Sequence, residues 1–292
     1  MPAVTQIPDH CPIVFRNNWE ALTQQKMARL EQAVTVVEQT DGESQKFNQI
    51  GSLTMTKNTA RAQKTNIVDL PLADRWLYPY PYDVGNIFDK WDERFLGKVI
   101  LPKSPTVSAH AMAYNRALDD VIIEAAKGTA YSGKDGTTPN VFDTANQTVV
   151  HGSAQITLDK LIEGRGIFGS NDVDEDDPIT FFYNQNALNE LLTEAKLTSS
   201  DYADVKALQT GKPVQFLNMT WVRSERLPKT GNIRSLYMVA KSGIALDPGS
   251  KQTMMDPRVD LSYALQIYSC AVMGAVRLEE KKVVEIQCDE SA

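Results

Sequence analysis

Apolar residues recur at three- and four-residue intervals over residues 105–128, and this period predicts the longest helix of the chain. Pro105 suits a first helical turn, and Gly128 provides a stop signal. At 1.5 Å per residue such a helix is roughly 35 Å long, enough to cross a whole domain. Arg116 and Asp120 stand four residues apart on the polar face, where we expect them to pair. The apolar face consists of Val107, Ala111, Tyr114, Leu118, Val121 and Ala125.

Shorter patterned segments fill most of the remaining chain. Three prolines and no period predict an extended arm over residues 1–16. Helical periods predict further helices over residues 17–39, 157–168, 184–195 and 199–208. Apolar runs predict strands at residues 179–183, 214–222 and 235–240, and two C-terminal strands joined by a charged turn at 279–282. Helices and strands in this mixed order, without an internal repeat, predict an α+β fold with a mixed sheet.

Residues 51–98 lack the apolar content of a core segment. The first part is β-prone but polar, and the second part, RWLYPYPYDVGNIFDKWDERF, crowds aromatic residues with prolines and acids. We expect a long two-stranded excursion, in which roughly 20 extended residues per arm would reach about 60 Å. Because an isolated hairpin is at best marginally stable, this excursion predicts contact with a neighbouring chain.

Cationic and aromatic side chains gather in this excursion and allow two interpretations. Stacking of nucleic-acid bases on a basic platform is one of them, but the acidic residues in the same stretch cancel its charge. Burial in a protein interface is favoured, because Trp, Tyr and Arg are enriched at interface centres. Together with one tryptophan of the N-terminal segment, the candidate interface residues are Trp19, Arg61, Lys64, Arg75, Trp76, Tyr78, Tyr80 and Tyr82.

Composition narrows the classes of protein that fit. The chain has 292 residues, of which 42% are hydrophobic and 23% charged, as in an ordinary globular protein with one large or two modest domains. Its net charge of -7 disfavours a non-specific binder of DNA or RNA. No apolar run is long enough to span a membrane, and the first residues lack the form of a signal peptide. We therefore expect a protein made and used in a cytoplasm.

Residues that carry catalysis or bind metals are sparse. The three cysteines, Cys11, Cys270 and Cys288, are widely spaced without a CxxC pair, which argues against a disulfide framework or a zinc site. The three histidines, His10, His110 and His151, are equally scattered, and no G-x-S-x-G elbow is present. We expect His110, near the start of the long helix, to be a structural or solvated residue. The sequence therefore predicts no catalytic residue, no cofactor and no metal site.

Two short motifs resemble ligand-binding loops. GTAYSGKD, residues 128–135, comes within one residue of a phosphate-binding loop, but it follows a helix instead of joining a strand to one, and Asp135 replaces the hydroxyl residue. A helix end followed by a glycine-rich turn is the better interpretation. NDVDEDDP, residues 171–178, alternates acids as a calcium loop does, but Asp177 and Tyr183 stand where that loop needs glycine and glutamate. We interpret it as an acidic turn between a helix and a strand.

Several stretches, taken in order, resemble the major capsid proteins of tailed bacteriophages, which have the Hong Kong 97-type fold. The likeness covers roughly residues 57–288 and is strongest after residue 105. The stretches that carry it are ALDDVIIEAAKGTAYSG, ITLDKLIEGRGIF, TSSDYADVKAL, RSERLP and YALQIYSCAVMGAVRLEEKKVVEIQC. No single stretch is diagnostic, but their order and spacing together are fairly specific.

This resemblance implies a division of the chain into five parts. They would be an N-terminal arm (1–50), an extended E-loop (51–98), a peripheral domain (99–154) with a spine helix at 105–128, an axial domain with a mixed sheet (155–260), and C-terminal strands that return to the peripheral domain (261–292). In the founding member of the fold an E-loop lysine is joined to an asparagine of another subunit. Lys57 and Lys64 lie in the corresponding region, but no asparagine or glutamate matches that chemistry, so no catalytic residue is carried over.

The resemblance implies a structural protein, not an enzyme. It would assemble with itself into pentamers and hexamers that form an icosahedral head around double-stranded DNA, in the virion, after assembly in the bacterial cytoplasm. Expected partners are portal and scaffolding proteins, a decoration protein, and packaged DNA through weak non-specific contact. The alternatives are an encapsulin-type compartment shell, which shares the fold, and a soluble enzyme of unknown type.

Overall fold

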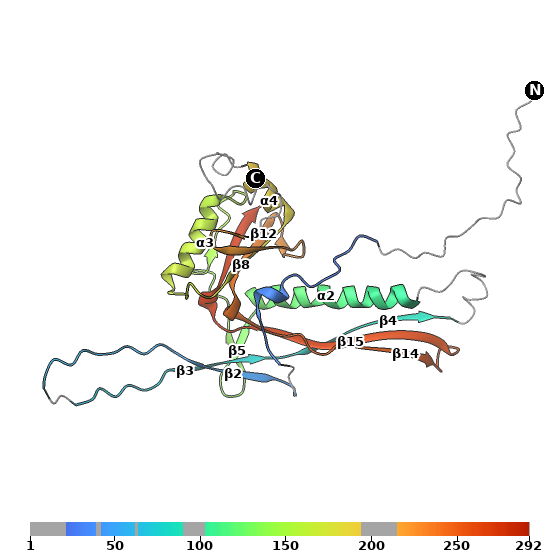
Figure 1. Ribbon diagram of the computed structural model, residues 1–292, viewed down its shortest axis with the longest axis horizontal. Helices are drawn as coiled ribbons and strands as arrows, with labels where there is room; N and C mark the ends of the chain where they lie inside the picture. Colours follow the sequence, from blue (N-terminus) through green and yellow to red (C-terminus); the bar gives the residue numbers. More distant parts are fainter. Residues whose placement is uncertain (1–21, 39–41, 62–63, 90–102, 194–214, 292) are drawn as a thin grey trace, which may run out of the picture.

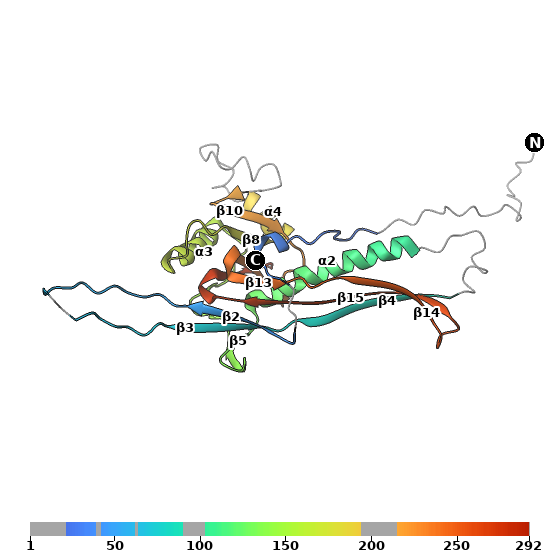
Figure 2. The same ribbon diagram turned by 60° about the horizontal axis from the view of Figure 1, so that its bottom comes forward.

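Three sheets and one long helix organise the part of the chain that the computed structural model describes (Figure 1). That part comprises residues 22–38, 42–61, 64–89, 103–193 and 215–291. The helix and the longest strands run side by side through the length of the molecule, and a smaller unit of helices and strands stands on one end of them (Figures 1 and 2).

The long helix, α2 (Lys103–Lys127), lies along a five-stranded sheet. The strand order is β1-β13-β15-β14, and β4 pairs with the other edge of β15. Leu118 and Ile122 of the helix are buried, whereas Met254 and Val272 of the sheet are exposed. The strands are β1 (Thr35–Val36), β4 (Tyr80–Phe88), β13 (Ile244–Asp247), β14 (Gln252–Arg258) and β15 (Ala264–Arg277).

A seven-stranded mixed sheet forms the smaller unit. Its order is β7-β16-β12-β8-β10-β9, with β11 paired to β12, and both parallel and antiparallel pairs occur. α3 (Leu158–Ser170) and α4 (Gln185–Thr193) accompany it. All five residues of β8 are buried, so this strand is the centre of the unit. The strands are β7 (Thr148–Val149), β8 (Ile179–Tyr183), β9 (Gln215–Phe216), β10 (Met219–Arg223), β11 (Lys229–Thr230), β12 (Ile233–Ala240) and β16 (Val283–Asp289).

A third sheet carries the extended excursion. Its strands, in order, are β2 (Gln45–Ile50), β3 (Leu72–Leu77), β5 (Ala130–Ser132) and β6 (Thr138–Asn140). Beyond β2 and β3, the described residues between 51 and 71 belong to no strand and run far out from the body (Figures 1 and 2). We call this segment, residues 51–71, the excursion, and β2 with β3 its root. Short 3-10 turns complete the fold: η1 (Glu31–Ala33), η2 (Lys241–Gly243) and η3 (Glu280–Lys282).

Most expected elements are confirmed. The predicted helix 105–128 is α2, and the helix expected from Thr157 begins one residue later, with the Thr157 hydroxyl accepting a hydrogen bond from the Lys160 backbone N–H. The predicted buried strand at 179–183 is β8, and the helix after it is α4. The fold is α+β with a mixed sheet, as the pattern of elements predicted.

The predicted N-terminal helix is wrong for the residues that can be compared. Residues 22–38 contain only η1 and β1, and two positions of the expected apolar face, Leu22 and Met27, are exposed. The reason is tertiary: α2 offers hydrogen-bond acceptors to this segment, and the isolated periodicity could not reveal them. Trp19 and the predicted helix 199–208 lie outside the described residues.

The expected pair between Arg116 and Asp120 is also wrong. The Arg116 guanidinium donates to Oε1 of Gln24 at 2.8 Å, and the Asp120 carboxylate accepts two contacts from Arg226, just beyond β10. Local spacing allowed the pair, but each side chain found a partner from another part of the chain. These contacts tie α2 to the N-terminal segment and to the smaller unit.

The structure changes two boundaries drawn from the sequence. The second half of 51–98 was expected to be an arm of the excursion, but residues 80–88 form β4, which pairs with β15 over nine residues. Residues 261–292 were expected to return together to the part that contains the long helix. β15 does lie along α2, but β16 pairs with β12 and belongs to the seven-stranded sheet. The charged turn at 279–282 thus links two sheets instead of closing a hairpin.

Asp119, fully buried in the middle of α2, anchors the N-terminal segment. Its carboxylate accepts hydrogen bonds from the backbone N–H groups of Arg29 and Leu30, at 3.0 and 3.1 Å, and from the Gln25 side chain. Buried donors of this kind are costly to leave unpaired. Residues 25–30 therefore depend on one carboxylate for their path along the helix.

We expect Asp119→Ala to reduce the free energy of unfolding by about 3 kcal/mol, because it removes the acceptor of several buried donors. Asp120→Ala is the matched control, since its pair with Arg226 is half exposed and should contribute less than about 1 kcal/mol. Urea unfolding of the unassembled chain measures both. Equal losses in the two variants would contradict the anchoring role.

Glu290 closes the edge of the smaller unit and predicts acid sensitivity. Although partial burial opposes its ionisation, hydrogen bonds from Arg234 and Lys229 hold the pKa of its carboxyl at about 2, below the ordinary 4.5. A lowered folded-state pKa stabilises the fold fully above pH 4.5, and this stabilisation is lost as the pH falls toward 2. We expect Glu290→Gln to lower the free energy of unfolding at pH 7 by at most about 3 kcal/mol. In denaturant titrations, the difference in free energy of unfolding between this variant and the wild type should shrink steadily below pH 4.5. A difference that stays constant with pH would refute this role. Asp260→Asn, at an exposed carboxylate, is the control.

Candidate interaction surface

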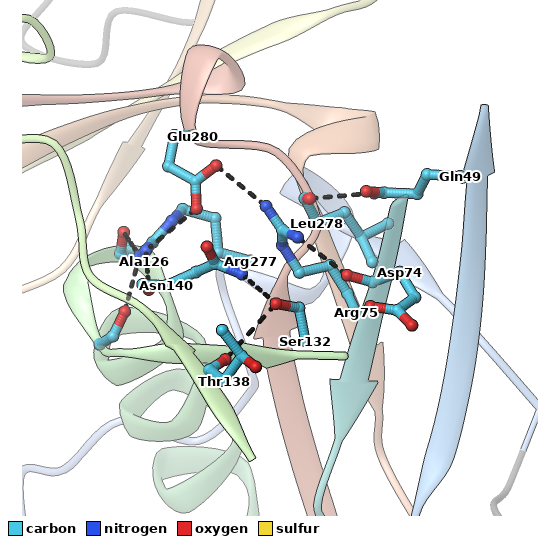
Figure 3. Close-up of polar contacts among 11 residues, drawn as sticks. Gln49, Asp74, Arg75, Ala126, Ser132, Thr138, Asn140, Arg277, Leu278 and Glu280 are labelled. Carbon is cyan, nitrogen blue, oxygen red and sulfur yellow. Dashed lines mark hydrogen bonds and ion pairs between the residues drawn. The ribbon is translucent and has the colours of Figure 1, made fainter. Parts of the chain in front are cut away.

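The root of the excursion meets the body at a buried arginine, Arg277, the last residue of β15 (Figure 3). Its guanidinium donates to the backbone oxygens of Ala126 at 3.1 Å, Gly128 at 2.7 Å and Asn140 at 3.3 Å. Its charge also lies 5.2 Å from the centre of the Phe142 ring. Burial lowers the pKa of this guanidinium, and the carboxylate of Glu280 partly restores it. Arg277 thus donates hydrogen bonds to carbonyls at the end of α2 that lack a partner within the helix, and it holds the β6 strand beside them.

Glu280 lies between this arginine and a second one from the root. Its Oε1 is 3.6 Å from Nη2 of Arg277, and its Oε2 is 3.1 Å from Nη2 of Arg75 on β3. On the neighbouring strand, the Gln49 side chain donates to the backbone oxygen of Leu278 at 2.9 Å. Figure 3 shows Gln49 and Arg75 reaching the same turn from two strands of the root.

The opposite face of the root holds the turn that follows α2. The Trp76 indole N–H donates to the Gly133 oxygen at 2.7 Å, and the Tyr78 hydroxyl donates to the Gly136 oxygen at 3.0 Å. Both glycines have positive φ, at 91° and 65°. This turn begins within the stretch that resembled a phosphate-binding loop. The helix end near Gly128 is confirmed, but residues 130–132 form strand β5 before the turn, where only a glycine-rich turn was expected. The backbone carbonyls of the turn are bound by aromatic side chains of the same chain.

Four of the five predicted aromatic interface residues come together in space. Trp76, Tyr78, Tyr80 and Tyr82 line one cleft of about 380 Å³, whose other wall includes Glu124 of α2. Tyr80 is 63% exposed and Tyr82 36%. Burial raises the pKa of the Tyr82 phenol, and the carboxylates of Glu124 and Asp120 raise it further. The cleft is therefore aromatic, with Glu124 and the buried Arg277 as its charged lining residues. Its aromatic rings suit cationic or aromatic side chains of a partner.

The remaining predicted residues lie on the excursion or outside the described chain. Arg61 and Lys64 are exposed near its tip, and Arg75 is in the root. The excursion also exposes apolar side chains that a single chain leaves in water: Leu53, Met55, Ile67, Val68 and Leu70. Exposed apolar side chains gathered on one segment are typical of an interaction surface. Sequence spacing alone did not single out these apolar residues.

The histidine and the acidic stretch that the sequence singled out have structural positions. His110 is buried, with ring nitrogens 3.1 Å from the Ser269 hydroxyl and 2.7 Å from Asn86 Oδ1, so it is structural, as one of the two expectations held. Burial, with a smaller effect of Lys251, lowers its pKa. The acidic stretch 171–178 is the connection between α3 and β8, as expected. Among the described residues, no three His, Cys, Asp or Glu side chains gather as a metal site, and no helix is long and apolar enough to cross a membrane.

Comparison with known proteins gives a consistent result. A family model described as phage capsid protein matches residues 7–290. A search of curated proteins found no match. Among solved structures, one from Mycobacterium phage Che8 is 16% identical, with a TM-score of 0.69 over 96% of this chain and 98% of that chain.

Two further structures extend the likeness. The capsid asymmetric unit of cyanophage Pam1 is 12% identical, with a TM-score of 0.71 and full coverage of both chains. The acidic stable capsid of Helicobacter pylori bacteriophage KHP30 is 10% identical, with a TM-score of 0.74 over 96% of each chain. At such identities the likeness establishes the fold.

We expect Gly136→Ala to loosen the turn from the root. An added Cβ would lie 2.1 Å from the Tyr78 hydroxyl, at a φ of 65° that disfavours alanine. The control is Gly152→Ala, which has a similar φ of 56° but no atom within 4 Å. Denaturant unfolding should show a loss of about 1 kcal/mol for the control, from backbone strain alone, and about 2–3 kcal/mol for Gly136→Ala. Equal losses would show that the Tyr78 contact contributes nothing.

Proposed function

The chain belongs to the phage capsid protein family and is a major capsid protein of a tailed bacteriophage, and we propose that its copies assemble into pentamers and hexamers that close an icosahedral head around double-stranded DNA. Its fold is of the Hong Kong 97 type, and its role is structural, not enzymatic. The family match favours a genome-enclosing head over the two alternatives, an encapsulin-type compartment and a soluble enzyme.

The observation that carries the proposal is the excursion. The described residues of the excursion leave the body with exposed apolar side chains. Gly51 N–H donates to the Pro71 oxygen at 2.8 Å, which closes the base of the segment. We assign this segment as the E-loop, which lies over an adjacent subunit. Its apolar residues then become buried only in the assembly, where they stabilise the contact.

The distribution of charge indicates which surfaces of two copies meet. Residues 51–68 contain Lys57, Arg61 and Lys64 but no acid, whereas the whole chain has a net charge of -7. A cationic tip is attracted to the acidic remainder of a second copy. The aromatic cleft beside Tyr80 and Tyr82 is a receiving site, because its rings can contact the cationic side chains of the tip. Attraction between tip and body offsets the repulsion between acidic subunits, which is screened beyond about 10 Å at 0.1 M salt.

The predicted interface residues then have different tasks. Arg61 and Lys64 contact the neighbour directly, and Tyr80 and Tyr82 receive a neighbour's side chains. Arg75, Trp76 and Tyr78 hold the root, because their polar groups are already bonded within the chain. We place Trp19 in an N-terminal arm that exchanges between subunits.

The proposed parts of the subunit follow the sequence division with the two changed boundaries. α2 is the spine helix of a peripheral domain that also includes β4, β13, β14 and β15. The seven-stranded sheet with α3 and α4 is the core of the axial domain, to which β16 contributes a strand. Residues 1–50 remain assigned to an N-terminal arm. Closed shells need contacts that tolerate small changes of angle, and exchanged arms and loops supply them.

Further partners follow from the role in the virion. We propose portal and scaffolding proteins, a decoration protein, and assembly in the host cytoplasm. The negative net charge of the subunit keeps contact with packaged DNA weak, because a wall that bound phosphates tightly would oppose packaging and ejection.

The test is assembly of the expressed chain, followed by negative-stain electron microscopy and sedimentation velocity at several salt concentrations. The wild type should form closed shells or rings of five and six. In Lys57→Gln/Arg61→Gln/Lys64→Gln, the concentration needed for assembly should rise about tenfold, because three exposed ion pairs of about 0.5 kcal/mol each are lost. The effect should shrink at high salt.

The matched control is Lys134→Gln/Lys241→Gln/Lys281→Gln, which removes the same three charges from exposed positions of the body. Its assembly should improve slightly or not change. A monomer or dimer under all conditions, even with scaffolding protein supplied, would overturn the assembly proposal. Equal defects in the two triple variants would refute the role of the tip.

A further inference from the structure

Three of the five buried side-chain nitrogen or oxygen atoms without a hydrogen-bond partner, among the residues that the structure describes, lie at the root of the excursion. They are Nε of Arg75, Nε of Arg277 and Oε1 of Glu280. Buried polar atoms are nearly always paired, so a group of unpaired ones indicates a place where the contacts are not at their optimum. One carboxylate here serves two cations.

The root has two faces, because alternate residues of a strand point to opposite sides. Asp74 and Trp76 of β3 point to the turn after α2, where Asp74 accepts from the Gly133 N–H at 2.6 Å and Trp76 binds the Gly133 oxygen. Arg75 of the same strand points to η3, as Gln49 of β2 does to Leu278. The excursion is therefore held from two sides. On the side toward η3, Phe47 and the buried Leu77 pack against Val276 and Leu278. The polar contacts on this side are one ion pair and one neutral hydrogen bond.

The two arginines around Glu280 differ in how firmly they are fixed. The side chain of Arg277 is fully buried and is bound by three backbone oxygens. Arg75 is 12% exposed, and among the described residues its guanidinium donates to Glu280 and otherwise only to the backbone oxygen of its own neighbour, Asp74. If Arg75 moved away, Glu280 would keep Arg277 as its partner. No buried charge would be stranded in the body, and Arg75 would enter water with the root.

We propose that Arg75 and Glu280 form a releasable ionic latch that sets the direction in which the excursion leaves the body, with the turn at 133–136 as the pivot. This inference rests on the proposed function, because a closed shell requires one chain to reach neighbours at more than one angle. Arg75 and Glu280 are positioning residues. They need not touch the neighbour, but they control where the tip arrives.

The test uses the full-length chain, unassembled, with hydrogen exchange followed peptide by peptide. Arg75→Gln is the first variant, since it opens the latch and leaves the Glu280–Arg277 pair intact. We expect amide exchange in residues 45–50 and 72–77 to become about tenfold faster, with α2 and β12 unchanged. Glu279→Gln is the matched control. This neighbouring carboxylate is half exposed and pairs with Lys282 at 3.5 Å, so exchange at the root should stay within about twofold of the wild type.

A second variant separates a latch from general loosening. Glu280→Gln should speed exchange at the root as Arg75→Gln does, and the double variant should add little, because both remove one interaction. Additive effects, exchange that accelerates equally throughout the chain, or no change at the root would each overturn the latch. Under assembling conditions, Arg75→Gln particles should have a broader range of diameters than the control.

Failure of the latch and failure of the proposed function are distinguishable. If the wild type forms shells but exchange at the root is insensitive to Arg75→Gln, the latch is refuted and the assembly role stands. If root exchange responds as expected but the wild type forms no shells with scaffolding protein supplied, the latch stands as a local device and the assembly role is refuted.

Discussion

The buried guanidinium of Arg277 is the interaction on which the architecture depends. It sits where the end of α2, the β5–β6 hairpin and the end of β15 meet, and it bonds to backbone oxygens of residues far apart in the sequence. A helix end leaves carbonyls without partners, and a cation there satisfies them and opposes the helix dipole. Glu280 pairs with both Arg277 and Arg75, so it connects the buried guanidinium of Arg277 to the root of the excursion.

A second buried charge links α2 to the other unit in the same region. Glu285 of β16 is fully buried and accepts from Lys127 at 2.7 Å, from Ser235 at 2.5 Å and from Thr148 at 3.2 Å. Lys127 is the last residue of α2, so two successive strands, β15 and β16, both bind the end of one helix through charged groups. Such pairs are costly to break once buried, which favours a rigid body. A rigid body is what gives an adjustable excursion a fixed origin.

The sequence predicted what depends on local pattern. Periodicity found α2, α3 and β8, and the helix stop near Gly128 and the turn at Gly133 were interpreted correctly, although strand β5 between them was missed. It failed where distant partners decide. No local signal shows that residues 25–30 hydrogen-bond to Asp119 instead of forming a helix. Nor does one show that Asp120 pairs with Arg226 and not with Arg116, or that β16 belongs to a different sheet from β15. Composition singled out the aromatic residues that line the cleft, and their place in an interface stays a prediction. Arg277 and Glu280 were missed, because an arginine at a strand end and a glutamate in a charged turn read as solvent-exposed residues until the fold brings them together.

The incomplete burial of this chain is consistent with its role and not a defect of its folding. A monomer that buried the apolar residues of its excursion would have nothing to offer a neighbour, and one that fixed the excursion rigidly could meet neighbours at a single angle only. Phe47 and Leu77 pack the root against the body, and the ion pairs beside them suit this need better than that apolar packing does. Their partners can be exchanged for water at modest cost when they are partly exposed, whereas close-packed side chains resist small displacements. The buried charges of Arg277 and Glu285 are each bound by several partners and belong to the fixed part of the subunit. The carboxylate of Glu280 is shared between two arginines, and its contact with Arg75 marks the start of the adjustable part.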